Sequence, residues 1–162
     1  GMTRTVRKAG CYLDYGLYGC LAVGIPYANA AKLLHPDKRV LLVIGDGAAG
    51  FNFMEFQTAV RNNLPIVAVV ANDTLFGMIA HSQQIRLGHA IKDGTELGMV
   101  HYEKMVEALG GFGALVEKPE DIRPALEAAF KSGRTACINV MVDPATISPG
   151  SVALANLGAY KA

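Results

Sequence analysis

Four short apolar runs along the chain predict buried β-strands. Residues 40–44 form one run, which is ended by Gly45, and residues 66–70 form another between a proline and a polar turn. A continuous apolar run of roughly four to eight residues, bounded by such breakers, is typical of a strand buried on both faces of a parallel sheet. Residues 135–143 (TACINVMVD) predict a third strand, and residues 111–117 (GFGALVE) a shorter fourth.

Helical patterns fill the intervals between these runs. Phe53, Phe56 and Val60 are spaced so that they lie on one face of a helix over residues 52–63. Helix-start and helix-stop residues, or a high content of small side chains, predict three further helices over residues 19–34, 101–111 and 118–133. Residues 82–100 lack a regular pattern and are expected to form an irregular loop.

Strands that alternate with helices predict an α/β fold, a doubly wound parallel sheet with helices on both faces. A length of 162 residues suits a single domain. We expect this domain to span residues 1–162, with residues 1–12 as an N-terminal extension. Residues 144–162 are expected to form a C-terminal tail that lies over the surface or over a partner.

Composition narrows the classes of partner. The hydrophobic fraction is 51% and the mean hydropathy is +0.27, which is high, yet no apolar run reaches the length of roughly 18 residues that a membrane span needs. The apolar surplus therefore predicts a large interface and a homo-oligomer. The net charge is +1 with scattered Lys and Arg, which argues against nucleic acid as a partner.

The three cysteines, Cys11, Cys20 and Cys137, point to a reducing compartment. No pair has the C-x-x-C spacing of a structural zinc site. A sparse, odd number of cysteines is typical of cytoplasmic proteins, and the N-terminus lacks the layout of a signal peptide. We therefore expect a cytoplasmic protein.

Asp46 stands between Gly45 and Gly47 at the carboxyl end of the first predicted strand, where α/β proteins bind ligands. Glycines and the free N–H groups of a following helix suit phosphate, but a carboxylate would repel it unless a cation lay between them. Mg²⁺ is the natural candidate because it binds oxygen ligands and shares phosphate oxygens. Asn72 ends the next strand, so it is placed to give the same ion an amide oxygen.

Two other interpretations of this segment have to be weighed. A lone Gly-Asp-Gly is more often a turn than a site. Gly45, Gly47 and Gly50 also satisfy the dinucleotide pattern G-x-G-x-x-G, which would indicate a flavodoxin-like nucleotide-binding domain. Against the second interpretation, Asn72 stands where an acidic ribose ligand is expected, and no Gly-Lys-Ser/Thr follows as in a P-loop.

The stretch from Gly45-Asp46-Gly47 to Asn72-Asp73 resembles the thiamin diphosphate motif of the acetolactate synthase, glyoxylate carboligase and benzaldehyde lyase group. The leading segment GLYGCLAVGIPYANAAKLLHPDKRVLLVIGDG, the segment FGMIAHSQQ and the carboxyl-terminal part of the chain resemble the same group, so the likeness covers residues 13–143. It implies a thiamin diphosphate-binding fold, thiamin diphosphate and Mg²⁺ as cofactors, and C–C bond cleavage or formation on 2-oxo acids.

The resemblance also implies roles for individual residues. Asp46 and Asn72 would bind Mg²⁺ through side-chain oxygens, and Thr74 through its backbone carbonyl. The N–H groups of Gly47, Ala48 and Ala49, which follow Gly45, would donate to the diphosphate. The Gly16 carbonyl would accept a hydrogen bond from the pyrimidine amino group, and the Tyr18 side chain would prop the cofactor into a bent shape. Phe76, Gly77 and Met78 would line the pocket beside the thiazolium ring.

Three positions depart from the pattern of the group. The motif ends Ala71-Asn72-Asp73 instead of Asn-Asn, although the matching ligand Asn72 is kept. Ala48 replaces a common Ser, which removes a hydroxyl but no backbone donor. Tyr18 stands where Met, Leu or Ile is usual.

No residue of this chain matches the Glu that acts on the cofactor's pyrimidine ring, which in the group belongs to a second domain. Glu55 follows the motif on the diphosphate side and is expected at a solvated or interface position. We therefore predict no catalytic residue in this chain and a separate pyrimidine-domain subunit as partner. The alternative is a stand-alone, non-catalytic protein that binds the cofactor or only assembles with a partner.

Overall fold

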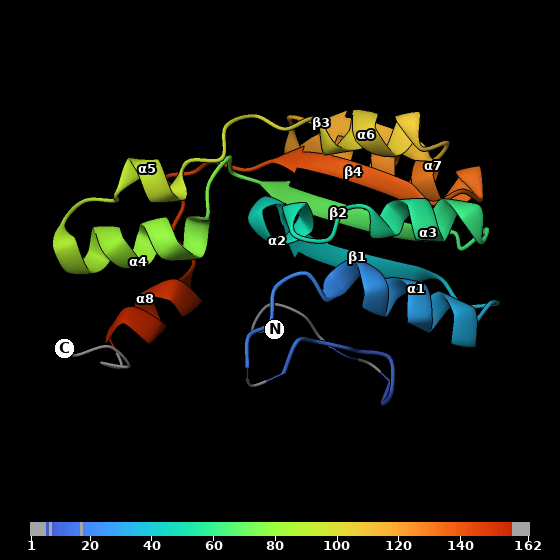
Figure 1. Cartoon of the computed structure of the whole chain (residues 1–162), viewed down its shortest axis with the longest axis horizontal. Coiled ribbons are helices and arrows are strands. Elements are labelled where there is room, and N and C mark those ends of the chain that lie inside the picture. The colour runs from blue at the N-terminus through green and yellow to red at the C-terminus, as the bar shows by residue number, and fades with distance from the viewer. Residues whose placement is uncertain (1–5, 7, 17, 157–162) are drawn as a thin grey trace.

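A computed structural model of the chain describes residues 6, 8–16 and 18–156, so the predicted extension 1–12 and tail 144–162 lie partly outside the described residues. Four parallel strands form one sheet in the order β1-β2-β4-β3 (Figure 1). The strands are β1 (Val40–Gly45), β2 (Ile66–Asn72), β3 (Phe112–Val116) and β4 (Ala136–Met141). All four strands predicted from the apolar runs are therefore present.

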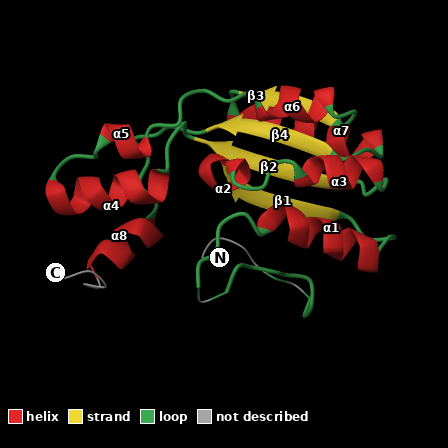
Figure 2. Cartoon of the chain, viewed as in Figure 1, coloured by secondary structure: helices red, strands yellow, loops and turns green. Residues whose placement is uncertain are grey.

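Helices cover both faces of the sheet, as predicted, but unequally (Figure 2). The first face is covered by α1 (Gly24–Leu34), α2 (Asp46–Gly50), α3 (Glu55–Arg61) and α6 (Tyr102–Ala108), whose side chains share one core cluster with alternate residues of β2. The second face is covered by α7 (Ile122–Ser132), which follows the short 3₁₀ helix η1 (Pro119–Asp121). Gly110 follows α6 with a φ of 96°, the left-handed conformation expected at a helix end.

The prediction that the first strand is buried on both faces is wrong. Strand β1 lies at the edge of the sheet, and its residues alternate between half-buried and exposed. Leu41 and Val43 project on the side covered by α7, but α7 packs over the other three strands, so Val43 remains 64% exposed. The continuous apolar run therefore predicts the strand correctly, but one face of this strand is exposed in the single chain.

Two segments differ from their predicted form. The predicted helix 19–34 begins at Gly24, because Ala22 takes a left-handed φ of 71° and breaks the helix there. The predicted loop 82–100 contains the second half of α4 (Gly77–Leu87), and α5 (Lys92–Thr95). Helix α4 packs on another helix instead of the sheet. It is therefore only weakly amphipathic, and its sequence carries little apolar periodicity.

The C-terminal residues form α8 (Pro149–Asn156), which lies against α4. Ser151 Oγ donates a hydrogen bond to Met78 Sδ at 3.3 Å, and His81 Nε2 lies 2.9 Å from the Pro144 carbonyl oxygen. Helices α4, α5 and α8 form a helical lobe at one end of the molecule, away from the sheet (Figure 1). Across the described ranges, the molecule has no helix with the length and apolar character needed to cross a membrane.

Candidate functional site

The parallel register brings the predicted metal-binding residues together at one edge of the sheet. Gly45 of β1 pairs with Ala71 of β2, so the following residues, Asp46 and Asn72, leave adjacent strand ends side by side. Asp46 begins α2, and Asn72 is the last residue of β2. Two polar side chains are thus fixed at the carboxyl edge by the ends of adjacent parallel strands.

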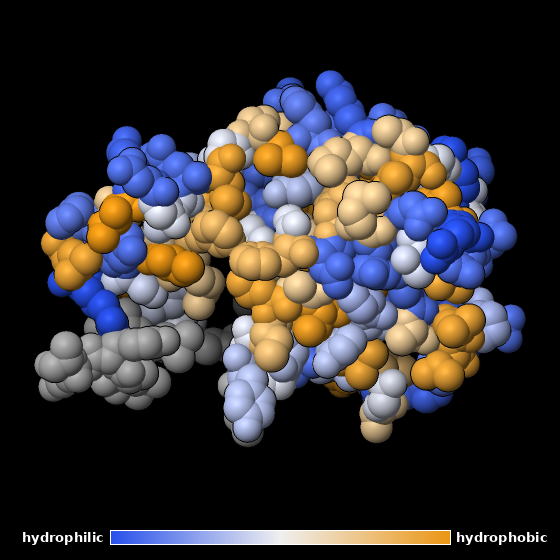
Figure 3. Space-filling model, viewed as in Figure 1, coloured by the Kyte–Doolittle hydropathy of each residue, from blue (hydrophilic) through white to orange (hydrophobic). Residues whose placement is uncertain are grey.

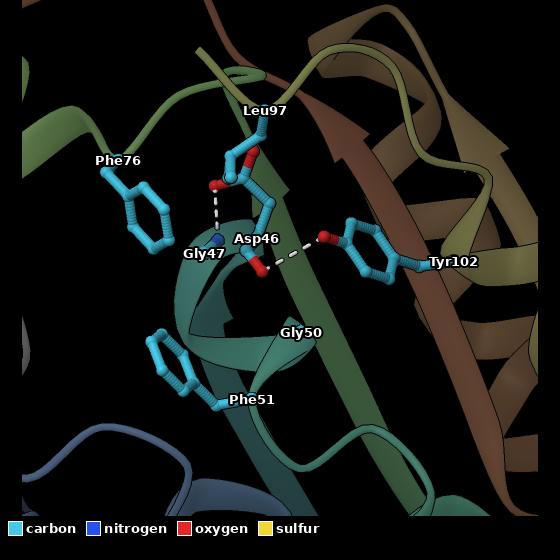
Figure 4. Close-up of a pocket in the computed structure, with 7 residues that line it drawn as sticks. All are labelled: Asp46, Gly47, Gly50, Phe51, Phe76, Leu97 and Tyr102. Atoms are coloured by element: carbon cyan, nitrogen blue, oxygen red, sulfur yellow. Dashed lines mark hydrogen bonds between the residues drawn. The ribbon is translucent and has the colours of Figure 1, made fainter. Parts of the chain in front are cut away.

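A cavity of about 290 Å³ lies at this edge. Phe51 and Phe76 stand on one side of the α2 turn and Tyr102 on the other, with Leu97 beside the Asp46 carboxylate (Figure 4). The lining residues are Asp46, Gly47, Gly50, Phe51, Phe76, Leu97 and Tyr102. The cavity therefore has mostly apolar walls and one carboxylate.

Asp46 is buried to the point where only 3% of its surface is exposed, and its two carboxylate oxygens have different surroundings. Oδ1 accepts the Gly47 N–H at 2.8 Å, whereas Oδ2 has no hydrogen-bond partner. Burial raises the pKa of this carboxyl group above its ordinary value; the Asp73 charge adds to the rise, and the N–H groups of Gly47 and Thr74 oppose it. An unpartnered buried carboxylate oxygen is costly unless a cation or donor completes it.

The loop after Asn72 turns toward the same point. The Thr74 N–H donates to Asn72 Oδ1 at 3.1 Å and also faces the Asp46 carboxylate, whose pKa it lowers. Thr74 takes a left-handed φ of 64°, which is strained for a β-branched residue and costs roughly 1–3 kcal/mol. Its carbonyl accepts the Leu97 N–H at 2.8 Å, which leaves one lone pair for another partner.

Gly47 allows the Phe76 ring to approach the backbone of α2. A Cβ at position 47 would lie 2.6 Å from Phe76 Cδ1, closer than real contacts of this kind allow. The Phe76 ring also packs on Phe51, with ring centroids 6.1 Å apart. In the first turn of α2, which is capped by Gly45, the N–H group of Ala48 has no acceptor within the helix. Glycine and two aromatic rings thus shape a narrow cradle beside a free backbone donor.

The structure brings some of the predicted site residues to the cavity and leaves others elsewhere. Gly16 lies in an N-terminal turn, where its N–H donates to Asp14 Oδ1, and the Tyr18 side chain is 95% exposed. Gly77 begins α4, and a Cβ there would collide with the Asp73 carboxylate. Met78 is exposed and contacts α8. These four residues are absent from the lining of the cavity in the single chain. Of the other predicted residues, Asp46, Gly47 and Phe76 line the cavity, and the rest do not, namely Gly45, Ala48, Ala49, Asn72 and Thr74.

Sequence reasoning missed two groups of residues at this edge. Tyr102 lines the cavity, and its hydroxyl donates to the Asp46 carbonyl oxygen at 3.1 Å. Asn139 and Glu103 are buried behind Asn72 and are linked to it by hydrogen bonds. Only the position of Asn139 within an otherwise apolar predicted strand could have drawn attention to this second group.

In the described part of the chain, no group of three or more His, Cys, Asp or Glu side chains lies close enough together to hold a metal ion. The predicted ligand set is of another kind, because it combines one carboxylate, one amide oxygen and one backbone carbonyl. Such oxygen donors suit a hard cation that keeps water or phosphate oxygens in its remaining positions.

Comparison with known proteins gives a consistent result. The family model described as "Thiamine pyrophosphate enzyme, C-terminal TPP binding domain" matches residues 2–140. A solved structure, the thiamine diphosphate-dependent 4-hydroxybenzoylformate decarboxylase of Rhodococcus jostii RHA1, is similar with a TM-score of 0.72 and 25% identity; the likeness covers 78% of this chain and 24% of that one. The predicted fold and the predicted resemblance are thereby confirmed.

Curated relatives show closer sequence similarity. The acetolactate synthase large subunit IlvG of Mycobacterium tuberculosis is 44% identical over 140 residues, which cover 86% of this chain and 25% of that protein. A 2-hydroxyacyl-CoA lyase of Oryza sativa subsp. japonica is 38% identical over 136 residues, or 82% of this chain and 24% of that protein. The chain therefore spans about a quarter of the length of these relatives.

Proposed function

Because the chain belongs to the family of C-terminal TPP-binding domains of thiamine pyrophosphate enzymes, we propose that its cavity holds the diphosphate end of this cofactor through Mg²⁺. Enzymes of this class use thiamine pyrophosphate with a divalent metal, typically Mg²⁺. We propose further that the chain is the diphosphate half of an active site for C–C bond cleavage or formation on 2-oxo acids, as in acetolactate synthases. The similarity to an acetolactate synthase subunit supports this assignment.

The observation that carries the proposal is the buried, unpartnered Oδ2 of Asp46. A carboxylate in a mostly apolar cavity would repel a diphosphate, but a Mg²⁺ bound to Oδ2 would complete this oxygen and attract the phosphate oxygens. Asn72 Oδ1 and the Thr74 carbonyl each accept one N–H and keep a second lone pair for the ion. The donor set on the chain thus fits the metal that the family uses.

The chain's own residues would then hold the diphosphate and exclude water from it. The N–H groups of Gly47, Ala48 and Ala49 lie beside the predicted metal site, where they would donate to phosphate oxygens, and that of Ala48 has no acceptor within the helix. Phe51, Phe76 and Leu97 give the cavity apolar walls, which strengthen these electrostatic contacts by lowering the local dielectric. Gly47 keeps the space that Phe76 needs.

Bound thiamine pyrophosphate supplies a nucleophilic carbon and a sink for the electrons that C–C bond cleavage releases. Loss of the proton from that carbon requires an acid at the pyrimidine ring. Asp46 is the one carboxylate that lines the cavity in the described part of the chain, and it faces the proposed metal. Glu55 lies in the first turn of α3 and does not line the cavity. We therefore propose that a separate pyrimidine domain supplies the acid.

Two further features belong to the proposal. The free thiols of Cys11 and Cys20 are exposed, which suits a reducing cytoplasm. Gly16 and Tyr18 are proposed to contact the cofactor's pyrimidine only when a partner places the N-terminal turn over the cavity, since neither lines it in the single chain.

Proton exchange at the reactive carbon of thiamine pyrophosphate tests this division of roles. The chain is mixed with thiamine pyrophosphate and Mg²⁺ in D₂O, and loss of the thiazolium C2 proton is followed by quenched-flow NMR. The expected exchange on the chain alone is roughly 10²–10⁴-fold slower than with an added pyrimidine-domain subunit, the usual contribution of acid–base help. Equally fast exchange in both samples would contradict the half-site proposal.

A further inference from the structure

A line of hydrogen-bonded side chains runs from the surface to the back of Asn72. Asn72 Nδ2 donates to Asn139 Oδ1 at 3.1 Å, and Asn139 Nδ2 donates to Glu103 Oε2 at 2.8 Å. The other carboxylate oxygen of Glu103, Oε1, lies 2.8 Å from His101 Nδ1. Asn72 and Asn139 are fully buried and Glu103 is 4% exposed, so water does not compete for these bonds.

The chemistry of these groups gives the line a single direction. An ionised carboxylate only accepts hydrogen bonds, so Glu103 requires the NH₂ group of Asn139 to point toward it. The Asn139 oxygen then points the other way and requires the NH₂ group of Asn72. Asn72 Oδ1 is left on the opposite side, where it accepts the Thr74 N–H.

The Val100 carbonyl strengthens the same arrangement. It accepts hydrogen bonds from Nδ2 of Asn72 at 3.2 Å and from Nδ2 of Asn139 at 3.1 Å. A flipped Asn72 would set its oxygen against the oxygens of Val100 and Asn139, and its NH₂ group against the Thr74 N–H. Each such mismatch in a buried site costs roughly 1–3 kcal/mol, so two or three together exclude the flipped form.

Glu103 stays ionised although it is buried. Burial alone would raise the pKa of Glu103, but the hydrogen bonds from Asn139 and His101 outweigh this effect and hold the pKa below its ordinary value. Apolar side chains of similar volume would fill the contact between α6 and β4 without the desolvation cost of a charge. A structural requirement for packing therefore does not explain the polarity of this line.

We propose that Glu103 and Asn139 are positioning residues, which fix the amide of Asn72 so that Oδ1 faces Asp46 and the metal site. This inference rests on the proposed function, because it assigns the fixed oxygen to Mg²⁺. Glu103 acts through Asn139, and neither residue lines the cavity. Their effect is to hold one ligand ready, so that metal binding does not have to reorient a buried amide.

The first test uses NMR of the full chain without cofactor. The Asn72 side-chain amide protons are assigned by their loss in Asn72→Asp, and their exchange with solvent is measured. Glu103→Met and Asn139→Leu each break the line with an apolar side chain, and each is expected to speed this exchange at least tenfold. Glu103→Gln keeps an oxygen for Asn139 and should change it less than twofold. Unchanged exchange in both apolar variants would overturn the inference.

The second test measures the Mg²⁺ concentration that half-saturates thiamine pyrophosphate binding, by calorimetry well below each variant's unfolding temperature. Glu103→Met and Asn139→Leu are expected to raise it at least tenfold, and Glu103→Gln less than twofold. The control is Asn29→Leu, which removes another buried Asn, one that donates to the Glu55 carbonyl and does not line the cavity. It should leave the Mg²⁺ requirement unchanged, whatever its effect on stability.

The outcomes separate the two proposals. An unchanged Mg²⁺ requirement in both apolar variants would overturn the positioning role, whatever their stability. If the wild-type chain shows no Mg²⁺-dependent binding at all, the proposed function fails, whereas the NMR comparison, which needs no cofactor, still decides whether Glu103 and Asn139 orient Asn72.

Discussion

Asp46 carries the clearest conflict between stability and binding in the molecule. Its Oδ2 is buried without a hydrogen-bond partner, and burial raises the pKa of the carboxyl group. A raised pKa means that the ionised form is less favourable in the folded chain than in the unfolded chain, so the associated stability is lost as pH rises through the folded pKa. At neutral pH, therefore, the charge that would bind the metal weakens the cofactor-free fold.

Asp46→Asn should stabilise the cofactor-free chain at neutral pH, because it removes the buried charge and keeps an oxygen for the Gly47 N–H. We expect the unfolding midpoint to rise by about 2–4 °C, which corresponds to roughly 1 kcal/mol for a domain of this size. Differential scanning calorimetry in EDTA measures the change. A lower midpoint for Asp46→Asn than for the wild type would show that the carboxylate is not a source of strain.

Gly47→Ala should weaken cofactor binding through Phe76. The added Cβ would lie 2.6 Å from the ring and would push it into the cavity. We expect about tenfold lower affinity for thiamine pyrophosphate with Mg²⁺, or roughly 1.4 kcal/mol, by calorimetry. Gly94→Ala is the matched control, since a Cβ at this position in α5 meets nothing within 4 Å. Equal affinity for Gly47→Ala and wild type would contradict the claim that the close approach of Phe76 to Gly47 shapes the cofactor site.

The residues that the sequence indicated most clearly are those whose positions follow from strand ends alone. Asp46 and Asn72 end adjacent apolar runs, so a parallel sheet must bring them together. Tyr102 and Asn139 belong to later segments, and their contacts with this edge depend on β4 lying beside β2. Local patterns do not determine that strand order, which is why these contacts were missed.

At the scale of elements, the sheet could be predicted from local patterns and the helical lobe could not. The four strands are short apolar runs between breakers, and their buried side chains make the pattern visible. Helix α4 contacts α8 instead of the sheet, so residues 82–87 show no strong apolar periodicity. The exposed face of β1 was not predicted, because its apolar residues suggest a burial that the single chain does not provide.

The contribution of Glu103, in the contact between α6 and β4, to the free energy of unfolding should depend on pH. The pKa of Glu103 is lowered in the folded chain, so its contribution to stability is present above the ordinary value of 4.5 and is lost as pH falls through the folded pKa. We expect the difference in unfolding free energy between wild type and Glu103→Gln to shrink steadily below pH 4.5. Urea unfolding between pH 3 and pH 7 measures it. A difference that grows as pH falls would mean that Glu103 is destabilised by its surroundings.

At the scale of the whole molecule, the sheet and the helical lobe leave apolar surface uncovered. Leu41 and Val43 are exposed on β1, Phe51 at the cavity, and Met78 on α4 of the helical lobe. Figure 3 shows apolar residues around the hollow between the helical lobe and the sheet. Exposed apolar surface of this kind marks contacts with other proteins, so it supports the proposed homo-oligomer and the proposed pyrimidine-domain partner.

The purified chain should therefore self-associate. We expect a dimer or larger species in sedimentation equilibrium, and we expect Val43→Lys to shift it toward monomer by placing a charge on the open face of β1. Leu34→Lys is the control, because Leu34 is similarly exposed but lies at the end of α1, on the opposite face of the sheet. A monomeric wild-type chain at high concentration would contradict the interface assigned to β1.

The central claim is that metal and diphosphate bind as one unit at Asp46. Calorimetric titration of thiamine pyrophosphate into the chain, in Mg²⁺ and in EDTA, tests it most directly. We predict saturable binding in Mg²⁺, and at least a hundredfold loss of affinity, or about 2.7 kcal/mol, both in EDTA and in Asp46→Ala with Mg²⁺. Affinity that stays the same in EDTA and in Asp46→Ala would contradict the account, because the buried carboxylate would then have no cation to hold.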